Sequence, residues 1–303
     1  MTIQEKTKVF IDESVNILTG AEADEALLKR NDRGYFTDGK GVAKVSRDRW
    51  VSAQTAERAH WMGRGGLRAS SDRNEEHWRN FDYYSSIAGR TFERAIEVGC
   101  GPFTNMRFIS TICKIKQLDL LDPLMNDYTT HPFCRFKGGE LILDDPQESK
   151  VRKLSEKVLG RLSPQAFLTA KKWLHRSIPV NECFALGAED LPAHSYDLIV
   201  MINVIEHCLD VEAIFERVLK AAAPNAIFVF HDKLYRSKEV QETLEYLFDA
   251  AHPLRVDGQL VESFLLKNFE TLLWNRKSLE KIYANGDKTE KNLLYYVGRL
   301  KSE

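Results

Sequence analysis

The sequence predicts an α/β protein with a mostly parallel β-sheet that is covered by helices on both faces. Beyond residue 90, short apolar segments alternate with segments of helical periodicity. The apolar segments are hydrophobic throughout instead of at every second position, as expected for strands that are buried on both faces. The length of 303 residues suits one such domain of about 200–250 residues with an accessory region.

Four central strands are predicted, at residues 95–98, 118–121, 196–202 and 226–230. Helices follow the first and the third of these strands. Thr104 is the candidate N-cap of a helix whose apolar stripe runs from Met106 to Ile112, and Asp210 is the candidate N-cap of a second helix that Pro224 ends. The domain is completed by a helix near 259–266 and two further strands, 270–274 and 293–300.

Two regions lie outside this alternating pattern. Residues 1–90 are polar with scattered aromatic side chains and predict a mainly helical N-terminal cap region, with helical periodicity at 11–18, 49–61 and 75–87. This leaves 91–303 as the domain that contains the sheet. About 60 residues separate Asp122 from the next strand candidate, near Cys183, far more than one crossover needs, so 124–180 is interpreted as a helical insertion. Its segment 146–176 carries eight basic against two acidic residues, typical of a solvated helix face or of a lid that attracts an anionic substrate.

The composition disfavours several classes of protein. The 43 basic and 44 acidic residues nearly cancel, which disfavours a nucleic-acid binder, and a hydrophobic share of 43% argues against a mainly disordered chain. The first ten residues lack the apolar core of a signal peptide, and no apolar run approaches 18 residues. The five cysteines include no C-x-x-C pair. We therefore expect a cytoplasmic protein with free thiols and no membrane partner.

The residues that carry chemistry lie at the ends of the first two strands. Gly99 and Gly101 allow a tight turn and a close approach of a ligand to the backbone. The dinucleotide pattern G-x-G-x-x-G requires a third glycine where Thr104 stands. Glu97 would repel a pyrophosphate but suits an ammonium or a sulfonium, and Asp122 is placed to accept hydrogen bonds from ribose hydroxyls. These two acids fit S-adenosylmethionine better than a nicotinamide dinucleotide.

Five segments then occur in a characteristic order: Glu97–Gly101, Asp122, Leu186–Pro192, Tyr196–Val200 and Asn203–His207. In this order they resemble the motifs of class I S-adenosylmethionine-dependent methyltransferases, and the resemblance covers residues of about 90–300. It implies a Rossmann-like, mostly parallel seven-stranded sheet with an antiparallel C-terminal hairpin, to which the last two predicted strands correspond. It also implies S-adenosyl-L-methionine as the cofactor.

The same resemblance implies a set of cofactor-binding residues, namely Glu97, Gly99, Gly101, Asp122, Ala188, Glu189 and Asn203. Glu97 would face the methionine part of the cofactor, with Asn203 beneath it, and Asp122 would bind the ribose. Ala188 and Glu189 would lie beside the adenine.

Two histidines are candidates for a catalytic base, which a hydroxyl acceptor needs in order to lose its proton. His207 and, as a second choice, His231 directly follow predicted strands, where an open α/β sheet places its ligands. The Glu206-His207 pair is similar to part of the metal-binding motif of small-RNA 2′-O-methyltransferases. Because Asn203 stands where that motif has a further acid, we predict no metal site.

The sequence therefore predicts methyl transfer from S-adenosylmethionine to a small polar molecule. The group that receives the methyl group is expected to be a hydroxyl of a sugar or a similar metabolite. The acceptor is expected to be anionic if the basic insertion is a lid. Trp50, Gln54, Glu57 and Trp61 combine aromatic and polar groups that suit either a substrate cap or core packing. The alternatives are an RNA- or protein-modifying methyltransferase, which the basic insertion favours and the neutral net charge disfavours, and a non-catalytic S-adenosylmethionine-binding module.

Overall fold

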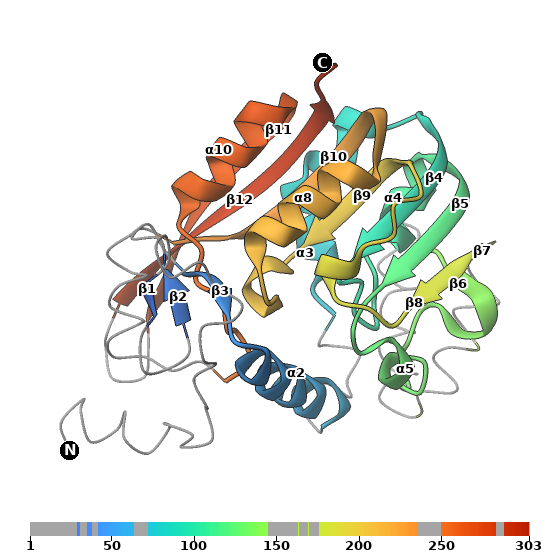
Figure 1. The fold of residues 1–303 in the computed structure, drawn as a ribbon. Helices are drawn as coiled ribbons and strands as arrows, with labels where there is room; N and C mark the ends of the chain where they lie inside the picture. Colours follow the sequence, from blue (N-terminus) through green and yellow to red (C-terminus); the bar gives the residue numbers. More distant parts are fainter. Residues whose placement is uncertain are drawn as a thin grey trace.

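A seven-stranded sheet with the strand order β11-β12-β10-β9-β4-β5-β8 forms the centre of the molecule (Figure 1). Its strands are β4 (Thr91–Val98), β5 (Lys114–Leu121), β8 (Glu182–Phe184), β9 (Tyr196–Ile202), β10 (Ala222–Leu234), β11 (Phe269–Ile282) and β12 (Lys288–Leu300). The computed structural model describes residues 29–30, 35–37, 42–63, 72–144, 163, 169, 176–235, 250–282 and 288–302.

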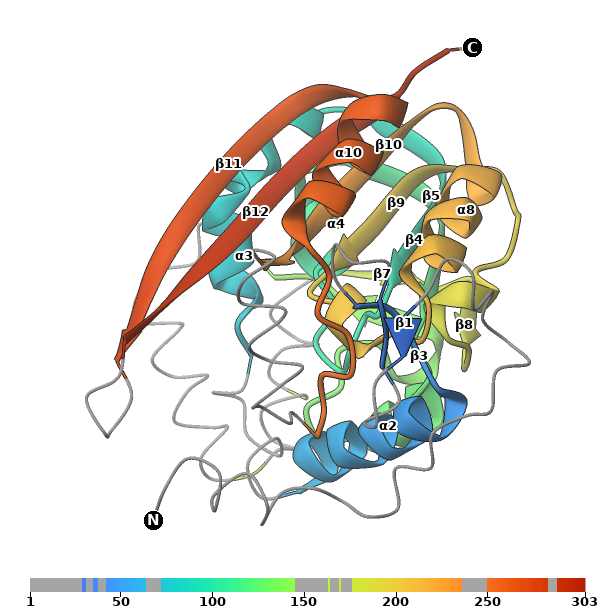
Figure 2. The same ribbon diagram turned by 60° about the vertical axis from the view of Figure 1, so that its left-hand side comes forward.

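The sheet has the predicted topology. Strands β8, β5, β4, β9 and β10 pair in parallel, whereas β12 is antiparallel both to β10 and to β11. Figure 2 shows the β11–β12 hairpin along one edge of the sheet, with α10 packed in front of it. The expected mostly parallel sheet with an antiparallel C-terminal hairpin is confirmed.

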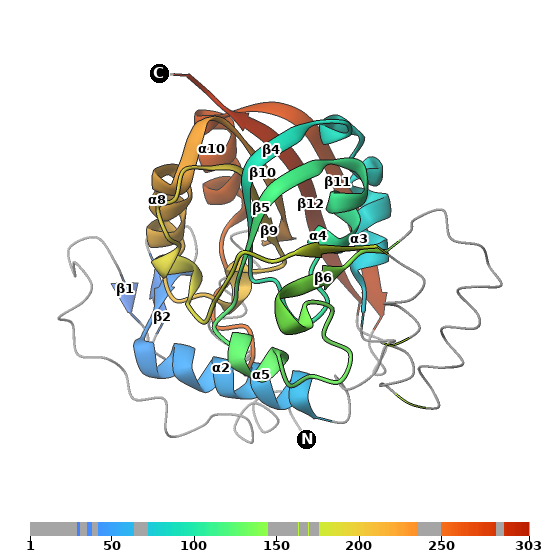
Figure 3. The ribbon, with the colours of Figure 1, turned by 90° about the vertical axis from the view of Figure 1, so that its right-hand side faces the viewer.

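Four helices cover the two faces of the sheet, α8 (Val211–Ala221) and α10 (Gly258–Asn268) on one, α3 (Asn74–Asn80) and α4 (Met106–Ile112) on the other (Figure 3). Successive residues of a strand enter opposite layers. In β9, Ile199 and Met201 belong to the core that includes α8 and α10, and Leu198 and Val200 belong to the core that includes α3 and α4. The central strands are apolar throughout because both of their faces are buried.

The N-caps of α8 and α4 can be compared with the two that the sequence predicts. Asp210 caps α8 as predicted, because its side chain accepts hydrogen bonds from the backbone N–H groups of Glu212 and Ala213. The prediction of Thr104 as the N-cap of α4 is wrong by one residue, since Asn105 occupies that position. The Thr104 hydroxyl instead donates to a buried carboxylate inside the sheet.

The N-terminal region supplies a helix and a small sheet. Helix α2 (Arg47–Met62) lies across the carboxyl ends of the parallel strands, below the sheet in Figures 1 and 3. Before it come the strands β1 (Lys29–Arg30), β2 (Tyr35–Thr37) and β3 (Val42–Val45), which form a three-stranded sheet that the expectation of a mainly helical region did not include. The helix expected within 11–18 lies outside the described residues.

The helix expected over 75–87 in the N-terminal region and the insertion at 124–180 also differ in detail from the prediction. The helix expected over 75–87 is divided into α3 and the 3₁₀ segment η2 (Asp82–Ile87), at a kink with positive φ angles. The described part of the insertion contains the short helix α5 (Met125–Tyr128) and the antiparallel strands β6 (Glu140–Ile142) and β7 (Ser177–Pro179). The helix predicted within 146–176 lies almost wholly outside the described residues. None of the helices in the described segments is long and apolar enough to cross a membrane.

Arg107, on the first turn of α4, joins three segments of the chain through ion pairs. Its guanidinium is 1% exposed and pairs with Asp72 (Nη1 to Oδ2, 2.5 Å) and with Asp144 (Nε to Oδ2, 3.0 Å). Asp144 also pairs with Arg135, at 2.6 Å. Removing the Arg107 cation takes the counter-charge from Asp72 and leaves Asp144 with Arg135 as its partner.

We expect the substitution Arg107→Met to lower the free energy of unfolding by about 3–5 kcal/mol, because Asp72 and Asp144 then lose their shared partner in a buried setting. Urea unfolding followed by circular dichroism measures this loss. Arg79→Met is the matched control, since Arg79 is exposed on the neighbouring helix α3, and it should change the stability by less than about 0.5 kcal/mol. Equal effects of the two substitutions would contradict the structural role of the Arg107 pairs.

Candidate active site

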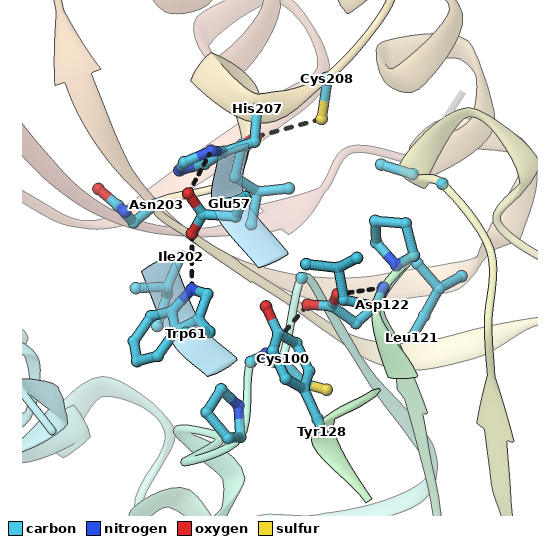
Figure 4. A pocket seen from close by; sticks show the side chains of 18 of the residues that line it. Glu57, Trp61, Cys100, Leu121, Asp122, Tyr128, Ile202, Asn203, His207 and Cys208 are labelled. Atoms are coloured by element: carbon cyan, nitrogen blue, oxygen red, sulfur yellow. Dashed lines mark hydrogen bonds and ion pairs between the residues drawn. The ribbon is translucent and has the colours of Figure 1, made fainter. Parts of the chain in front are cut away.

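A pocket opens at the carboxyl ends of β4, β5 and β9, next to α2 (Figure 4). The space inside it amounts to about 940 Å³, a volume that includes the part open to solvent. It is lined by seven of the nine residues predicted from the sequence, Gly99, Gly101, Asp122, Ala188, Glu189, Asn203 and His207. The two others, Glu97 and His231, do not line it.

The turn after β4 brings backbone to the wall of the pocket. Gly99 and Gly101 have φ angles of +68° and +54°, a region that side chains disfavour. A Cβ atom at Gly99 would lie 2.5 Å from Cγ2 of Val204, whereas one at Gly101 would meet nothing within 4 Å. Gly99 is therefore required for packing against the loop after β9, and Gly101 leaves open space in the pocket.

Asp122 directly follows β5 and holds this turn from the other side. Its Oδ2 accepts a hydrogen bond from the N–H of Gly101 at 3.1 Å, and its Oδ1 accepts one from Leu124 at 2.9 Å. Burial raises the pKa of this carboxyl group to about 7, although the two N–H donors oppose the shift. Asp122 thus changes between an ionised and a protonated form near neutral pH.

Glu97 lies behind the turn. It is 1% exposed, and its carboxylate accepts hydrogen bonds from the Thr104 hydroxyl, from the backbone and side-chain amides of Asn105 (2.9 Å each) and from the N–H of Met106 (3.3 Å). Burial raises its pKa, and these donors oppose the rise. The carboxylate that was expected to face the methionine part of the cofactor is occupied by the loop that forms the pocket wall.

The remaining cofactor-site candidates come from the ends of β8 and β9. Ala188 and Glu189 lie in the 3₁₀ turn η4 (Ala188–Asp190), and Oε1 of Glu189 accepts hydrogen bonds from the N–H groups of Leu209 and Asp210 at 2.6 and 3.0 Å. Burial raises the pKa of Glu189. Asn203 has a left-handed backbone with φ +61°, a conformation that non-glycine residues adopt mainly at turns and functional sites.

His207 is the predicted base that the structure places in the pocket. It ends the 3₁₀ turn η5 (Ile205–His207), and its Nδ1 lies 3.1 Å from the carbonyl oxygen of Ala251 and 3.8 Å from Oε2 of Glu57. Figure 4 shows the Glu57 carboxylate between the His207 ring and Trp61, whose Nε1–H donates to Glu57 at 2.6 Å. Burial lowers the pKa of His207, while Glu57 and Glu206 act to raise it.

His231, the second candidate base, is a residue of the core. It is 3% exposed, its Nδ1 lies 2.8 Å from the carbonyl oxygen of Leu294, and its ring stacks on Tyr295 with a centroid separation of 4.0 Å. Burial and the neighbouring His77 lower its pKa to about 3. His77, which does line the pocket, separates His231 from it by a ring contact of 4.8 Å between centroids.

A group of possible metal ligands lies beside His207. One ligand atom each of Glu206, His207 and His252 falls within 4.8 Å of the others. However, the Lys233 ammonium contacts Oε1 of Glu206 at 2.5 Å, and the Arg255 guanidinium lies 3.8 Å from its Oε2. Burial alone would raise the pKa of Glu206, but Lys233 and the two histidines hold it at about 2. A carboxylate that is already neutralised by an ammonium is a weak ligand for a further cation.

Arg73 and Asn105 also line the pocket, although nothing in the sequence predicted a site role for them, and so does His77, one of the aromatic and polar residues of the predicted cap region. Their segments contain no motif that would identify them. The hypothesis that α2 forms part of the site rested on its aromatic and polar residues, and Trp50, Gln54, Glu57 and Trp61 all line the pocket. Their spacing along one face of a helix was the available signal.

Comparisons with known proteins agree on one kind of domain. A family model described as a methyltransferase domain matches residues 70–276. No curated protein matches the chain in sequence. Among solved structures, a putative methyltransferase from Bacillus halodurans C-125 is similar with a TM-score of 0.50 at 9% identity, over 74% of this chain and 100% of that chain.

Two further structures are similar over most of the chain. One is the N-methyltransferase NodS from Bradyrhizobium japonicum WM9 in complex with S-adenosyl-l-homocysteine, with a TM-score of 0.49 at 15% identity, over 83% of this chain and 99% of that chain. The other is a SAM-dependent methyltransferase from Leishmania major, with a TM-score of 0.44 at 17% identity, over 82% of this chain and 81% of that chain.

The two glycines of the turn should respond differently to substitution. We expect Gly99→Ala to lower the free energy of unfolding by about 2–5 kcal/mol, because the methyl group adds a clash with Val204 to the cost of a positive φ. Gly101→Ala should cost only the φ term, about 1–2 kcal/mol. Chemical denaturation of both variants measures the difference, and the double variant with Val204→Ala should recover part of the Gly99→Ala loss. No recovery would contradict the clash.

Proposed function

The chain belongs to the methyltransferase domain family with S-adenosylmethionine as its cofactor, and we propose that it methylates a hydroxyl group of a small polar molecule. The observation that carries this proposal is the position of the His207 imidazole in the pocket, with its Nδ1 3.8 Å from the Glu57 carboxylate. A hydroxyl acceptor has to lose its proton as the new bond forms, and a neutral imidazole is suited to accept it.

The residues of the pocket fit the cofactor. Asp122 presents a carboxylate to the cavity, as binding of ribose hydroxyls requires, and the open space at Gly101 lets a ligand approach the backbone. The side-chain Oδ1 of Asn105 is buried without a hydrogen-bond partner among the described residues, so the wall offers an acceptor to a donor group of a ligand. S-adenosylmethionine supplies a methyl group on a positively charged sulfur, which leaves as a neutral thioether.

The hydrogen bond of His207 determines which nitrogen can act as the base. The carbonyl oxygen of Ala251 can only accept, so Nδ1 of His207 must carry the proton of the neutral ring. Nε2 is then the nitrogen with a free lone pair. It would take the hydroxyl proton while the acceptor oxygen forms its bond to the methyl carbon.

Glu57 supports the charged form of His207. Accepting a proton converts the ring to an imidazolium, and the Glu57 carboxylate at 3.8 Å is placed to stabilise this charge. The hydrogen bond from Trp61 keeps the carboxylate in position. Gln54, one turn earlier on α2, donates to the backbone oxygen of His207 at 2.9 Å and so holds the two elements together.

The position of α2 favours a small acceptor over a macromolecule. This helix lies over the carboxyl edge of the sheet, and its side chains form part of the pocket wall (Figures 3 and 4). An acceptor that enters this cavity is in contact with α2 on one side, an arrangement that supports a metabolite with hydroxyl groups, such as a sugar. All five cysteines are free thiols, which supports a location in the reducing cytoplasm.

Cofactor affinity should depend on pH through Asp122. Its pKa of about 7 means that the carboxylate, the form that accepts two hydrogen bonds, is lost as the pH falls below 7. We expect the affinity for S-adenosylhomocysteine to be constant above about pH 7.5 and to fall by up to about tenfold per pH unit below pH 7. Calorimetric titration between pH 5.5 and 8.5 measures this profile, and Asp122→Asn should bind more weakly with no step near pH 7. A wild-type profile without that step would contradict the assignment of Asp122.

Removal of the base should affect turnover more than binding. We expect His207→Ala to lower turnover about 10²–10⁴-fold and to change the affinity for S-adenosylhomocysteine less than about threefold. Glu57→Gln should lower turnover only about 3–10-fold, because the pair is partly exposed. Transfer of a tritiated methyl group to the acceptor that the wild type selects from a panel of sugars and hydroxy acids measures both. Near-normal turnover of His207→Ala would exclude His207 as the base.

A further inference from the structure

We propose that His77 donates a hydrogen bond to an oxygen next to the hydroxyl that receives the methyl group, so that the acceptor is a neutral molecule with two neighbouring hydroxyls. The proposal rests on the proposed methylation of a hydroxyl and names the class of acceptor that the same pocket selects. Its basis is a second imidazole in the pocket wall, to which neither cofactor binding nor the proton transfer assigns a task.

His77 and His207 lie at the same end of the sheet. The ring of His77 contacts the ring of His231 with 4.8 Å between the centroids, and the carbonyl oxygen of His231 accepts a hydrogen bond from the N–H of Asn203 at 2.7 Å. Asn203 directly follows β9, and His207 lies in the turn that comes next. The pocket near the ends of β9 and β10 is therefore bounded by His77 from α3 and by His207 from η5.

One nitrogen of the His77 ring is available to a ligand. Its Nδ1 is buried with no hydrogen-bond partner among the described residues, whereas its Nε2 does not belong to these buried atoms. Since the residue lines the pocket, Nε2 is the nitrogen that can reach a bound molecule.

The His77 ring is neutral and can donate through this nitrogen. Burial, with the nearby Arg73, lowers the pKa of His77 to about 4. A neutral imidazole carries one proton, and buried N–H groups without an acceptor are rare in proteins. The proton of His77 therefore resides on Nε2 and not on the unpaired Nδ1.

The two imidazoles of the pocket thus have complementary hydrogen-bonding groups. Nδ1 of His207 donates to the carbonyl oxygen of Ala251, so Nε2 of His207 carries the lone pair that accepts the proton of the reacting hydroxyl. Nε2–H of His77 is a donor and suits an oxygen that keeps its lone pairs. A 1,2-diol supplies both oxygens in one molecule.

The direction of the His77 ring is held by a chain of contacts. The side-chain amide of Asn80, also on α3, donates to the Tyr295 hydroxyl at 2.8 Å. The Tyr295 ring stacks on His231 with a centroid separation of 4.0 Å, and His231 contacts His77. A site with a fixed donor for a substrate hydroxyl rejects a molecule that lacks this hydroxyl, because the donor then stays unpaired.

The charges of the pocket favour a neutral acceptor over a hydroxy acid. Glu57, Asp122 and Glu189 contribute carboxylates, and Arg73 is the one arginine or lysine in the described part of the pocket wall. A carboxylate on the acceptor would meet more negative than positive groups. The second oxygen is therefore assigned to a hydroxyl.

The first test observes His77 directly, by ¹⁵N NMR of the histidine rings in the full chain. We expect the signal that disappears in His77→Phe to be that of a neutral ring with its proton on Nε2. With S-adenosylhomocysteine bound, trans-1,2-cyclohexanediol should shift this signal. Cyclohexanol, which lacks the second hydroxyl, should leave it unchanged.

The second test measures transfer of a tritiated methyl group from S-adenosylmethionine to the same two alcohols. We expect kcat/KM of the wild type to be about 10–100-fold higher for the diol. His77→Phe keeps a ring against His231 and should lose this preference, with transfer to cyclohexanol changed less than about twofold. His194→Phe is the matched control, since His194 is exposed in the turn before β9 and outside the pocket wall, and it should keep the wild-type preference.

Three results would overturn the proposal. They are a proton on Nδ1 of His77, a His77 signal on which the two alcohols have the same effect or none, and a preference for the diol that persists in His77→Phe. A signal that the diol shifts, without transfer to either alcohol, would retain His77 as a contact to the diol and reject the methylation of a hydroxyl. The two hypotheses therefore fail in different ways.

Discussion

The buried carboxylate of Glu97 is the interaction on which the shape of the pocket depends. A negative charge that is 1% exposed persists only where hydrogen bonds replace its lost hydration. Glu97 obtains them from the residues that begin α4, so its charge requires the loop to fold back over the end of β4. The positive φ angles of Gly99 and Gly101 make this return possible. One buried charge thereby sets the turn, the start of the helix and the direction of the Asn105 amide.

A second constraint joins the N-terminal region to the sheet. The N–H of Val45 donates to the carbonyl oxygen of Leu209 at 2.9 Å, Lys44 pairs with Asp210 at 3.2 Å, and Gln54 donates to the carbonyl oxygen of His207. All three contacts reach the loop between β9 and α8. Segments about 150 residues apart in the chain therefore form a single pocket, and α2 both lines this pocket and holds the loop after β9.

The sequence predicted correctly those elements that depend on neighbouring residues. The strand at 196–202 and the cap at Asp210 follow from nearby residues alone. The burial of His231 inside the sheet could not be predicted in this way. The apolar run stops at Phe230, but β10 continues to Leu234 because β12 pairs with it as far as Asn292. A partner strand 60 residues away keeps His231 inside the sheet, and no pattern around the histidine contains that information. The positions of Arg73 and Asn105 in the pocket wall could not be predicted for the same reason, since contacts between distant segments bring them there.

Two opposing effects act on the pKa of His207, the residue that we propose as the base. Burial lowers this pKa and so favours the neutral ring. Glu57 and Glu206 act in the opposite direction and support the imidazolium once the proton has arrived. Asp232 holds the turn that carries His207. Its Oδ2 accepts hydrogen bonds from the N–H groups of Val204 and Ile205 at the start of this turn. Burial and the nearby Glu206 raise the pKa of Asp232 to about 7, whereas Lys233 keeps Glu206 ionised. The two carboxyl groups at the ends of β9 and β10 thus have different tasks: Asp232 holds the turn that leads to His207, and Glu206 pairs with Lys233 beside the His207 ring.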